Sequence, residues 1–432
     1  MAISAETDIP TKYGFVKASD IKVGDVVYDI NGNETQIESI KYESLDTSVT
    51  VRFGSAESLV LSQNQIIPVY VDPNKEIEYI SSEDVFSMCS KGWVAKLPSV
   101  TIKGNGAMSI NPWMLGFWLG DGSQHNANVS TCIDDLEYVK ERILSSGYSI
   151  GAIRRDNRFN QKGVSVSVTK GLLQQLKQYN IYRNKHMPDE VYSTDINYRR
   201  EVIKGLVDSD GMVEKSRGRA LFTNTNYDLA LGCARILSSL GEFVCIYPNT
   251  CHGFGKTVVC YVVTWMPLEL PAGMPRKAER VRRRKIIEKR TCRHIEFNIS
   301  YSGTPGINFT TTSGSMVISN FYIPIGTGKT PEISRETANK LFRTKATCPI
   351  YTKDKERIAH QINSISPGRY KVQEITKDRR INDWNKKRFL IDGCEYKGYR
   401  DAARAIGCSE HTVQRAIAAG RKIVWGHNIS LV

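Results

Sequence analysis

Over the first hundred positions, apolar and polar residues alternate in short segments, a pattern typical of β-strands with one buried face. Segments such as DVVYDI, TQIESIKY and SVTVRF follow one another, and turn residues such as Asn31 and Gly32 separate them. From about residue 110, apolar residues recur at helical spacing, first in a run after Pro112 and then around 133–146 and 170–178. The chain is therefore predicted to begin with a β domain over 1–105 and to continue with an α+β domain over 106–268.

The elements of the α+β domain follow the same order twice. In the first copy, a strand pair lies between the second and third helical stretches. After Pro188, a helix, a strand, a second helix and two strands are predicted at 199–208, 219–224, 226–240, 242–248 and 257–265. A repeated order of elements indicates an internal duplication, here of a helix–strand–strand–helix unit.

The rest of the chain divides into three further segments. Residues 269–320 return to short β segments and are predicted to complete the β scaffold, whereas 321–389 are polar and basic and resemble a linker or DNA-tracking arm. Residues 390–432 form a small compact unit. The predicted fold class is multidomain: an all-β scaffold in two parts, a duplicated α+β domain and a small, mainly α C-terminal domain.

A helix–turn–helix layout is predicted within this last segment, at 399–419. Gly407 makes the turn and Ser409 is a good N-cap for the second helix. The inner face would be apolar, and the outer face would present His411, Gln414 and Arg415, beside Glu410, to a DNA major groove. A plain helical hairpin that serves only for packing is the alternative.

The charge of the chain points to a polyanionic partner. The 432 residues hold 59 Lys+Arg against 45 Asp+Glu, and 22 of the basic residues against 11 acidic ones lie in 321–432. Such a balance favours nucleic acid, and a second basic run occupies 276–290. Solvated surface charge is the alternative for both runs. The candidates for phosphate contact are Arg282, Arg283, Arg284, Arg379, Arg380, Lys386, Lys387 and Arg388.

The composition argues against membrane and secretory classes. No run of 18 apolar residues is present, and the N-terminus lacks the layout of a signal peptide. The ten cysteines include no CxxC pair, so a zinc site is not expected. We therefore expect a cytoplasmic protein with reduced, buried thiols and no membrane partner.

The two halves of the duplication open with related peptides, 114–122 and 203–211, which end in Asp121-Gly122 and Asp210-Gly211. Small residues recur four positions apart in each: Gly116 and Gly120, then Gly205 and Ser209. On a helix these positions share one face, so two such helices can approach backbone to backbone. Each helix is predicted to end at its glycine.

Close packing of the two helices would bring Asp121 and Asp210 together at one end. Two carboxylates at that distance repel unless a cation lies between them, and helix C-termini also favour a cation. Oxygen ligands suit Mg²⁺, which can activate water and stabilise the leaving oxygen of a phosphodiester. A turn after a helix explains one such peptide, but two copies in a duplicated unit indicate a metal site.

The paired peptides resemble the motifs of double-motif LAGLIDADG homing endonucleases over roughly 110–266. The resemblance implies a monomer with an internal pseudo-twofold, whose sheets form a saddle over double-stranded DNA. It makes Asp121 and Asp210 the catalytic metal ligands, adds the carbonyl groups of Gly120 and Ser209, and implies Mg²⁺, with Mn²⁺ able to substitute. The segment 185–188 is similar to the block that carries a catalytic lysine, which would be Lys185; an ordinary surface lysine is the alternative.

The lysine of the second half has no clear position in the sequence. Lys256 is a weak candidate. The segment 237–241 also resembles the family.

The β segments on either side resemble the Hint fold of inteins, with an unrelated β domain as the alternative. The first block is similar to 2–14 and 21–25, and the last to 297–300, 308–309 and 317–320. Splicing begins with an acyl shift onto a Cys or Ser, but the aligned residue is Ala2. Gln65 and Ser319 stand where the resemblance implies histidines, and Phe321 stands in place of a nucleophile. Only Asn320, which could cyclise, remains.

These observations predict a site-specific homing endonuclease that hydrolyses both strands of a long DNA target with Mg²⁺, derived from an intein that has lost splicing. Two alternatives come from other classes. One is a protein-splicing element with an incidental nuclease, which Ala2, Gln65 and Phe321 argue against. The other is a sequence-specific DNA-binding protein that does not cut, which the two intact aspartates argue against.

Overall fold

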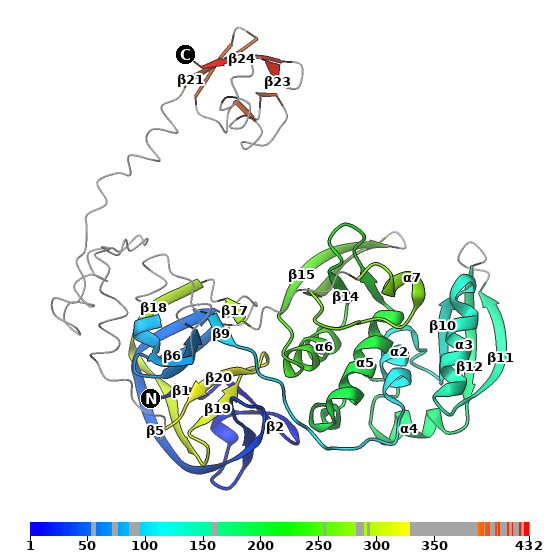
Figure 1. Cartoon of the computed structure of the whole chain (residues 1–432), viewed down its shortest axis with the longest axis horizontal. Helices are drawn as coiled ribbons and strands as arrows, with labels where there is room; N and C mark the ends of the chain where they lie inside the picture. Colours follow the sequence, from blue (N-terminus) through cyan, green and yellow to red (C-terminus); the bar gives the residue numbers. More distant parts are fainter. Residues whose placement is uncertain are drawn as a thin grey trace. The chain divides into compact units, whose positions relative to one another are not determined.

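A computed structural model describes residues 1–52, 58–70, 77–85, 96–156, 162–253, 256–281, 289–291 and 294–328, then 388–392, 394–397 and scattered positions from 402 to 431. The chain forms two compact units, Met1–Thr344 and Lys345–Val432. In the first unit a β-rich part and an α+β part are both present (Figure 1). A layout of several parts, as predicted, is thus confirmed.

The β-rich part is built on a seven-stranded sheet in the order β18-β1-β6-β5-β4-β2-β3. Strands β5 and β18 also pair antiparallel along most of their length, so that residues 37–52 lie beside 294–311. This pairing joins two segments that the α+β part separates in sequence. The strands are β1 (Ile3–Ser4), β2 (Asp8–Thr11), β3 (Gly14–Lys17), β4 (Val26–Tyr28), β5 (Glu34–Arg52), β6 (Ser58–Ser62) and β18 (His294–Thr311), with the 3₁₀ turn η1 (Ala18–Asp20) after β3.

Two smaller sheets complete this part. One has the order β17-β9-β7-β8, and the other is the hairpin β19-β20. The strands are β7 (Ile66–Tyr70), β8 (Ile77–Ser81), β9 (Lys96–Pro98), β17 (Lys289–Thr291), β19 (Ser315–Ile318) and β20 (Ile323–Gly326). All eight residues of the hairpin strands are buried. The predicted end of the scaffold at 320 is therefore too early, because β20 pairs with β19 inside the scaffold.

The α+β part contains two halves with the same sheet order, β10-β12-β11 in the first and β14-β16-β15 in the second, where β13 adds an edge strand. The first half comprises α2 (Pro112–Asp121), β10 (Asn128–Cys132), η2 (Ile133–Asp135), α3 (Leu136–Ser145), β11 (Ser149–Asp156), β12 (Gly163–Thr169) and α4 (Leu172–Gln178). After η3 (Asp189–Ser193), the second comprises α5 (Ile196–Asp208), β13 (Gly211–Val213), β14 (Ala220–Asn224), α6 (Tyr227–Ser239), β15 (Val244–Gly253), β16 (Lys256–Trp265) and α7 (Pro275–Ala278). The repeated order of elements is present in the structure, but each half begins helix–strand–helix–hairpin in place of the predicted helix–strand–strand–helix unit, with β13 as an extra strand in the second half.

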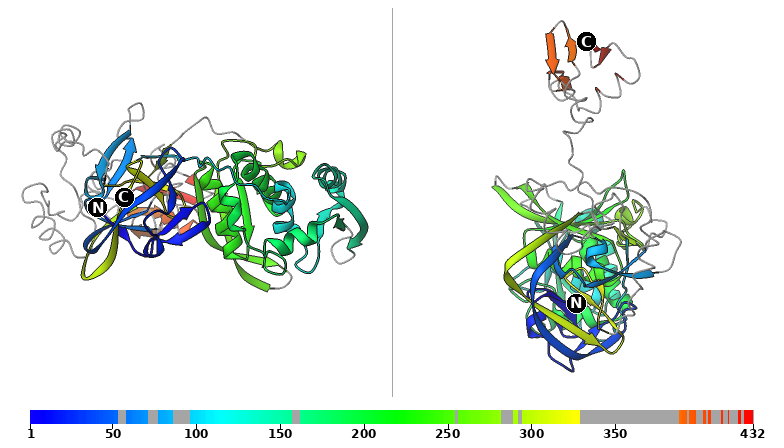
Figure 2. Two further views of the ribbon diagram at one scale, coloured as in Figure 1. Left: turned by 90° about the horizontal axis from the view of Figure 1, so that it is seen from below. Right: turned by 90° about the vertical axis from the view of Figure 1, so that its left-hand side faces the viewer.

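Helices α2 and α5 pack against each other between the two sheets (Figures 1 and 2). A Cβ on Gly116 would lie 2.1 Å from the Val202 carbonyl oxygen, and one on Gly205 would lie 2.2 Å from that of Trp113. Only glycine fits at these positions, which confirms the predicted backbone-to-backbone approach. The helices begin at good caps: Asn111 and Asp195 each accept a backbone N–H of the first turn through a side-chain oxygen.

The second unit carries a four-stranded antiparallel sheet in the order β22-β21-β24-β23. Its strands are β21 (Arg388–Ile391), β22 (Cys394–Lys397), β23 (Ile423–Val424) and β24 (His427–Leu431). The prediction of a mainly α unit did not include these strands, which the alternating segments at its two ends form. Most of the helix–turn–helix predicted at 399–419 lies outside the described residues. Between the strands, Ala402, Ala403, Ile406 and Val413 are buried, as expected for the inner face of the predicted helices.

Two general expectations can also be compared with the structure. Cys251 and Cys260 form a disulfide across β15 and β16, so the prediction that all thiols are reduced is wrong for this pair. The two residues lie on adjacent strands with Cα atoms 6.1 Å apart, a geometry that the sequence spacing alone does not reveal. No helix in the described part of the chain is both long and apolar enough to cross a membrane.

Candidate active site

The two predicted acids meet where α2 and α5 end. Asp121 is the last residue of α2, Asp210 follows α5 by two residues, and their side chains share a hydrogen bond. Close packing of the helices brings them together, since a Cβ on Gly120 would lie 2.1 Å from Ser209 Oγ. The predicted juxtaposition of the two carboxylates is thus present in the structure.

The electrostatics of the pair favour a cation. Burial raises the pKa of Asp121, and the carboxylate of Asp210 raises it further. Although part of Asp210 reaches the surface, loss of hydration around its carboxyl group raises its pKa as well. Two carboxylates can share a hydrogen bond only when one is protonated. A divalent cation would replace that proton and relieve the same repulsion.

Lys185 is the first cation beside the acids. Its Nζ donates to the carbonyl oxygen of Gly120 at 2.8 Å and lies 5.2 Å from the centre of the Trp118 ring. Burial lowers the pKa of Lys185 to about 8, and the two aspartates oppose this shift. Lys185 is therefore a charged group held against the acid pair, which argues against an ordinary surface lysine.

Lys277 is the second cation, and sequence reasoning missed it. Its side chain is 5% exposed, and its Nζ donates at 2.8 Å to the carbonyl oxygens of Val207, Asp208 and Ser209 at the end of α5. Ser209 and Gly120 both immediately precede the aspartate of their half. Each half therefore places one ammonium group on the carbonyl beside its acid.

The location of Lys277 corrects the prediction that the whole basic run 276–290 either contacts nucleic acid or is solvated surface charge. Arg276 pairs through two hydrogen bonds with Asp135, and Lys277 lies inside the protein, so neither residue belongs to a solvated arm. The similar spacing of acid and lysine in the two halves could have identified Lys277: Lys185 follows Asp121 by 64 residues, and Lys277 follows Asp210 by 67. The many neighbouring basic residues made this lysine hard to single out. Lys256 instead begins β16, where its backbone pairs with Gly253, and its side chain is outside the described part.

The donor set suits a hard cation with few protein ligands. Among the described residues, no cluster of three or more His, Cys, Asp or Glu side chains could hold a metal. Two carboxylates could hold Mg²⁺, which commonly binds one or two of them and takes water and substrate phosphate for the rest. The carbonyl oxygens of Gly120 and Ser209, predicted to contact the metal, each accept a hydrogen bond from Lys185 and Lys277, respectively.

The glycines after the acids are predicted to end their helices. Helix α2 does end at Gly122, its C-cap, but α5 already ends at Asp208, before Gly211, and neither glycine adopts a positive φ. A Cβ on Gly122 would lie 2.3 Å from the Trp118 carbonyl oxygen, and one on Gly211 would lie 2.5 Å from Val207 Cα. These glycines let the chain fold back tightly against its own helix.

The residual splicing positions lie inside the β-rich part. Ala2 is fully buried and its N–H donates to Ser62 Oγ, while Gln65 Nε2 donates to the Gly326 carbonyl oxygen at 2.7 Å. Ser319 adopts a φ of 68° and Phe321 is buried. The side chain of Asn320 accepts from Arg235 Nε at 2.7 Å and donates to Asp8 Oδ2 at 2.9 Å.

Most predicted DNA contacts fall on residues that the structure does not describe. Arg388 begins β21, but only its backbone belongs to the described part. The others lie outside the described residues: Arg282, Arg283, Arg284, Arg379, Arg380, Lys386, Lys387, His411, Gln414 and Arg415.

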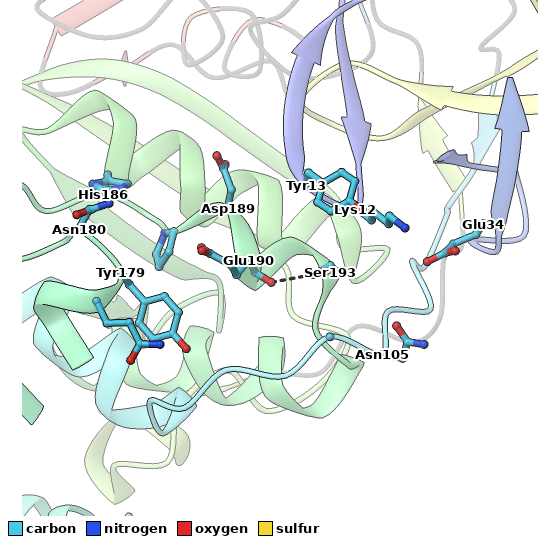
Figure 3. Close-up of a pocket in the computed structure, with 13 residues that line it drawn as sticks. Lys12, Tyr13, Glu34, Asn105, Tyr179, Asn180, His186, Asp189, Glu190 and Ser193 are labelled. Atoms are coloured by element: carbon cyan, nitrogen blue, oxygen red, sulfur yellow. Dashed lines mark hydrogen bonds between the residues drawn. The ribbon is translucent and has the colours of Figure 1, made fainter. Parts of the chain in front are cut away.

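A separate cavity of about 610 Å³ lies between the β2–β3 turn, which contributes Lys12 and Tyr13, and the segment 178–193 (Figure 3). Its lining is polar and of mixed charge, with Asp189 and His186 on one side. The acid pair and its two lysines are not among its lining residues, so this cavity is distinct from the candidate active site.

Comparison with known families identifies two segments of the chain. Residues 197–295 match the family model of the LAGLIDADG-like domain, and 391–417 match that of the NUMOD1 domain. The segment that matches the LAGLIDADG-like domain includes α5 from its second residue onward, together with Asp210 and Lys277. The predicted resemblance to this family is confirmed there.

A curated relative and several solved structures are also similar to the chain. A replicative DNA helicase DnaB of Mycobacterium intracellulare is 22% identical over 313 residues, which are 66% of this chain and 50% of the relative, so the chain spans about half the relative's length. A structure of mesophilic variants of the homing endonuclease I-DmoI is 17% identical, with a TM-score of 0.26 over 36% of this chain and 87% of that one. A structure of the MchDnaB-1 intein is 19% identical, with a TM-score of 0.16 over 18% and 57%.

Proposed function

We propose that this chain is a site-specific homing endonuclease that hydrolyses both strands of a long double-stranded DNA target with Mg²⁺. The observation that carries the proposal is the acid pair Asp121 and Asp210 at the ends of two closely packed helices, with one lysine in each half. The match to the LAGLIDADG-like domain over 197–295 supports the same assignment.

The roles of the residues follow from their positions. Bound Mg²⁺ would activate a water molecule and neutralise charge on the phosphate. Asp121 and Asp210 would give up their shared proton and hold the ion. In each cut, the water oxygen bonds to phosphorus, the bond from phosphorus to the leaving oxygen breaks, and that oxygen takes a proton.

The two lysines would stabilise the negative charge that develops on the phosphate. An ammonium group has three N–H donors. The hydrogen bond to Gly120 occupies one on Lys185, so the others can turn to a phosphate oxygen or a water. Lys277 uses all three on helix carbonyls and would contribute a fixed positive charge.

The β-rich part supports descent from an intein that no longer splices. Ala2 offers no nucleophile for the first acyl shift, and Phe321 offers none for the transfer that follows. The residues after Asn320 enter the core as β20, where Ile323 and Ile325 are each 3% exposed. Release of this segment would remove a strand from the scaffold, which supports a chain that stays continuous.

Recognition of DNA would use both units. The two sheets of the α+β part would form a pseudo-twofold saddle on the duplex, in keeping with their common strand order. The basic runs would contact phosphates and supply affinity, while base contacts from the sheets and the NUMOD1 segment would supply specificity. One chain would suffice for both strands, because it carries both halves.

The test uses the full chain and a plasmid library with genomic inserts, incubated with Mg²⁺ or with EDTA, followed by sequencing of the ends produced. The expected result is cutting of both strands at one defined sequence with Mg²⁺ and none with EDTA. Binding without cutting would overturn the proposal in favour of a DNA-binding protein. A change in the mass of the chain on incubation would show that splicing or cleavage chemistry survives.

A further inference from the structure

The Asp208 carboxylate has an unusual set of partners for a buried acid. Its Oδ1 accepts from the backbone N–H groups of Gly273 and Met274 at 2.9 and 2.8 Å. Its Oδ2 accepts from Trp113 Nε1 and the Tyr138 hydroxyl at 2.9 and 2.8 Å. A buried carboxylate is costly unless such bonds are made, and Asp208 is 2% exposed. It therefore ties three segments of the chain to the end of α5.

One of these segments carries Lys277. Met274 is the N-cap of α7, and the Lys277 N–H donates to the Met274 carbonyl oxygen at 2.9 Å. A Cβ on Gly273 would lie 2.3 Å from the Tyr138 hydroxyl, so the chain passes close to the first half at this point. The anchor at 273–274 thus fixes the start of α7, three residues before the lysine that reaches back to Ser209.

The first half has no carboxylate at the position that corresponds to Asp208. Leu119 stands two residues before Asp121, as Asp208 does before Asp210, and it is fully buried. Lys185 is held in another way: Asn226 Nδ2 donates to its backbone carbonyl oxygen at 2.7 Å, and its ammonium group lies over Trp118. The two lysines are therefore anchored by separate residues, one set for each half.

We propose that Asp208 is a positioning residue for one half of the active site: by holding 273–274 it fixes Lys277 beside Asp210, and its loss slows cutting of one DNA strand in preference to the other. This inference rests on the proposed function and adds that each half serves one strand. It also explains why Leu119 in the first motif corresponds to Asp208 in the second: Lys185 and Lys277 are held by different contacts.

The activity test follows each strand separately, with a different label on each 5′ end of the target duplex. Asp208→Leu gives the second motif the residue that the first motif carries, and Asp208→Asn is the milder variant should the first fail to fold. We expect cutting of one strand to fall by about 100-fold, the scale for a displaced active-site group, with the other within about threefold. Tyr138→Phe is the matched control, since it removes one bond to Asp208 but leaves 273–274 anchored.

A second readout needs neither DNA nor metal. The intact protein is treated with an amine-acylating reagent, N-hydroxysuccinimide acetate, and modification of Lys277 is measured by mass spectrometry. Lys277 should be protected in the wild type and in Tyr138→Phe, and modified in both Asp208 variants. Equal slowing of both strands, or continued protection of Lys277 in the Asp208 variants, would overturn the positioning role. A wild type that cuts no DNA would overturn the proposed function, and the acylation pattern would still decide the role of Asp208.

Discussion

At the residue scale, the site depends on small side chains as much as on charged ones. Asp121 and Asp210 can share a hydrogen bond only because Gly116 and Gly205 let the two helix backbones touch. A methyl group added at either glycine would push the two helices apart and so increase the distance between the two acids. The electrostatics of the acid pair are thus a consequence of helix packing.

This dependence predicts that Gly116→Ala and Gly205→Ala each lower the free energy of unfolding by about 1–3 kcal/mol, the usual range for overpacking. The added Cβ would lie within 2.2 Å of a backbone carbonyl oxygen of the partner helix, which cannot move without shifting that helix. Urea denaturation measures the change. Gly151→Ala is the control, because its Cβ would meet side chains no closer than 3.4 Å, and unfolding at wild-type denaturant concentration in both helix variants would refute the packing argument.

At the element scale, the repeated order of helices and strands could be predicted because hydrophobic periodicity reports each element locally. The acid pair could be predicted as well, since both motifs carry the same small-residue spacing. Lys277 could not, because its position depends on contacts of 273–274 with Asp208 and Tyr138, which are distant in sequence. Strand β20 was missed for a similar reason: whether an apolar tetrapeptide pairs with β19 or leaves the fold is decided by contacts distant in sequence.

Strand β20 gives a prediction at this scale. Ile325→Ala should lower the free energy of unfolding by about 2–5 kcal/mol, because it removes a buried aliphatic side chain from the scaffold core. Val23→Ala, at a position 62% exposed, should change it by no more than about 0.5 kcal/mol. Thermal or urea unfolding compares the two. Equal stability of both variants would mean that the segment after Asn320 is dispensable to the scaffold, contrary to the account given for lost splicing.

At the scale of the whole molecule, the candidate active site and much of the excess positive charge lie in different compact units. The acid pair and both lysines belong to the first unit, whereas the second unit, Lys345–Val432, holds 18 Lys+Arg against 9 Asp+Glu. The NUMOD1 segment falls within the second unit. The excess of charge should therefore affect how tightly the protein holds DNA and leave the cutting step itself unchanged.

Replacing the five basic residues at 379, 380 and 386–388 with Gln should weaken DNA binding and reduce its salt dependence. Each lost phosphate contact should lower the slope of log K against log salt by about 0.9. Binding is measured by fluorescence anisotropy from low to moderate salt, with cutting measured at saturating enzyme. Gln at the exposed scaffold positions Lys22 and Lys41 is the control. An unchanged slope in the fivefold variant would show that this segment is ordinary solvated charge.

The most direct measurement is strand-resolved cleavage of the target by the wild type, Asp121→Asn, Asp210→Asn and the double variant, all with Mg²⁺. Asn keeps the shape of Asp but lacks the negative charge that would hold the cation. Each single variant is expected to lose cutting of at least one strand, and the double variant is expected to cut neither, while all four bind the duplex. Cutting of both strands by the double variant at the wild-type rate would contradict a centre built on Asp121 and Asp210.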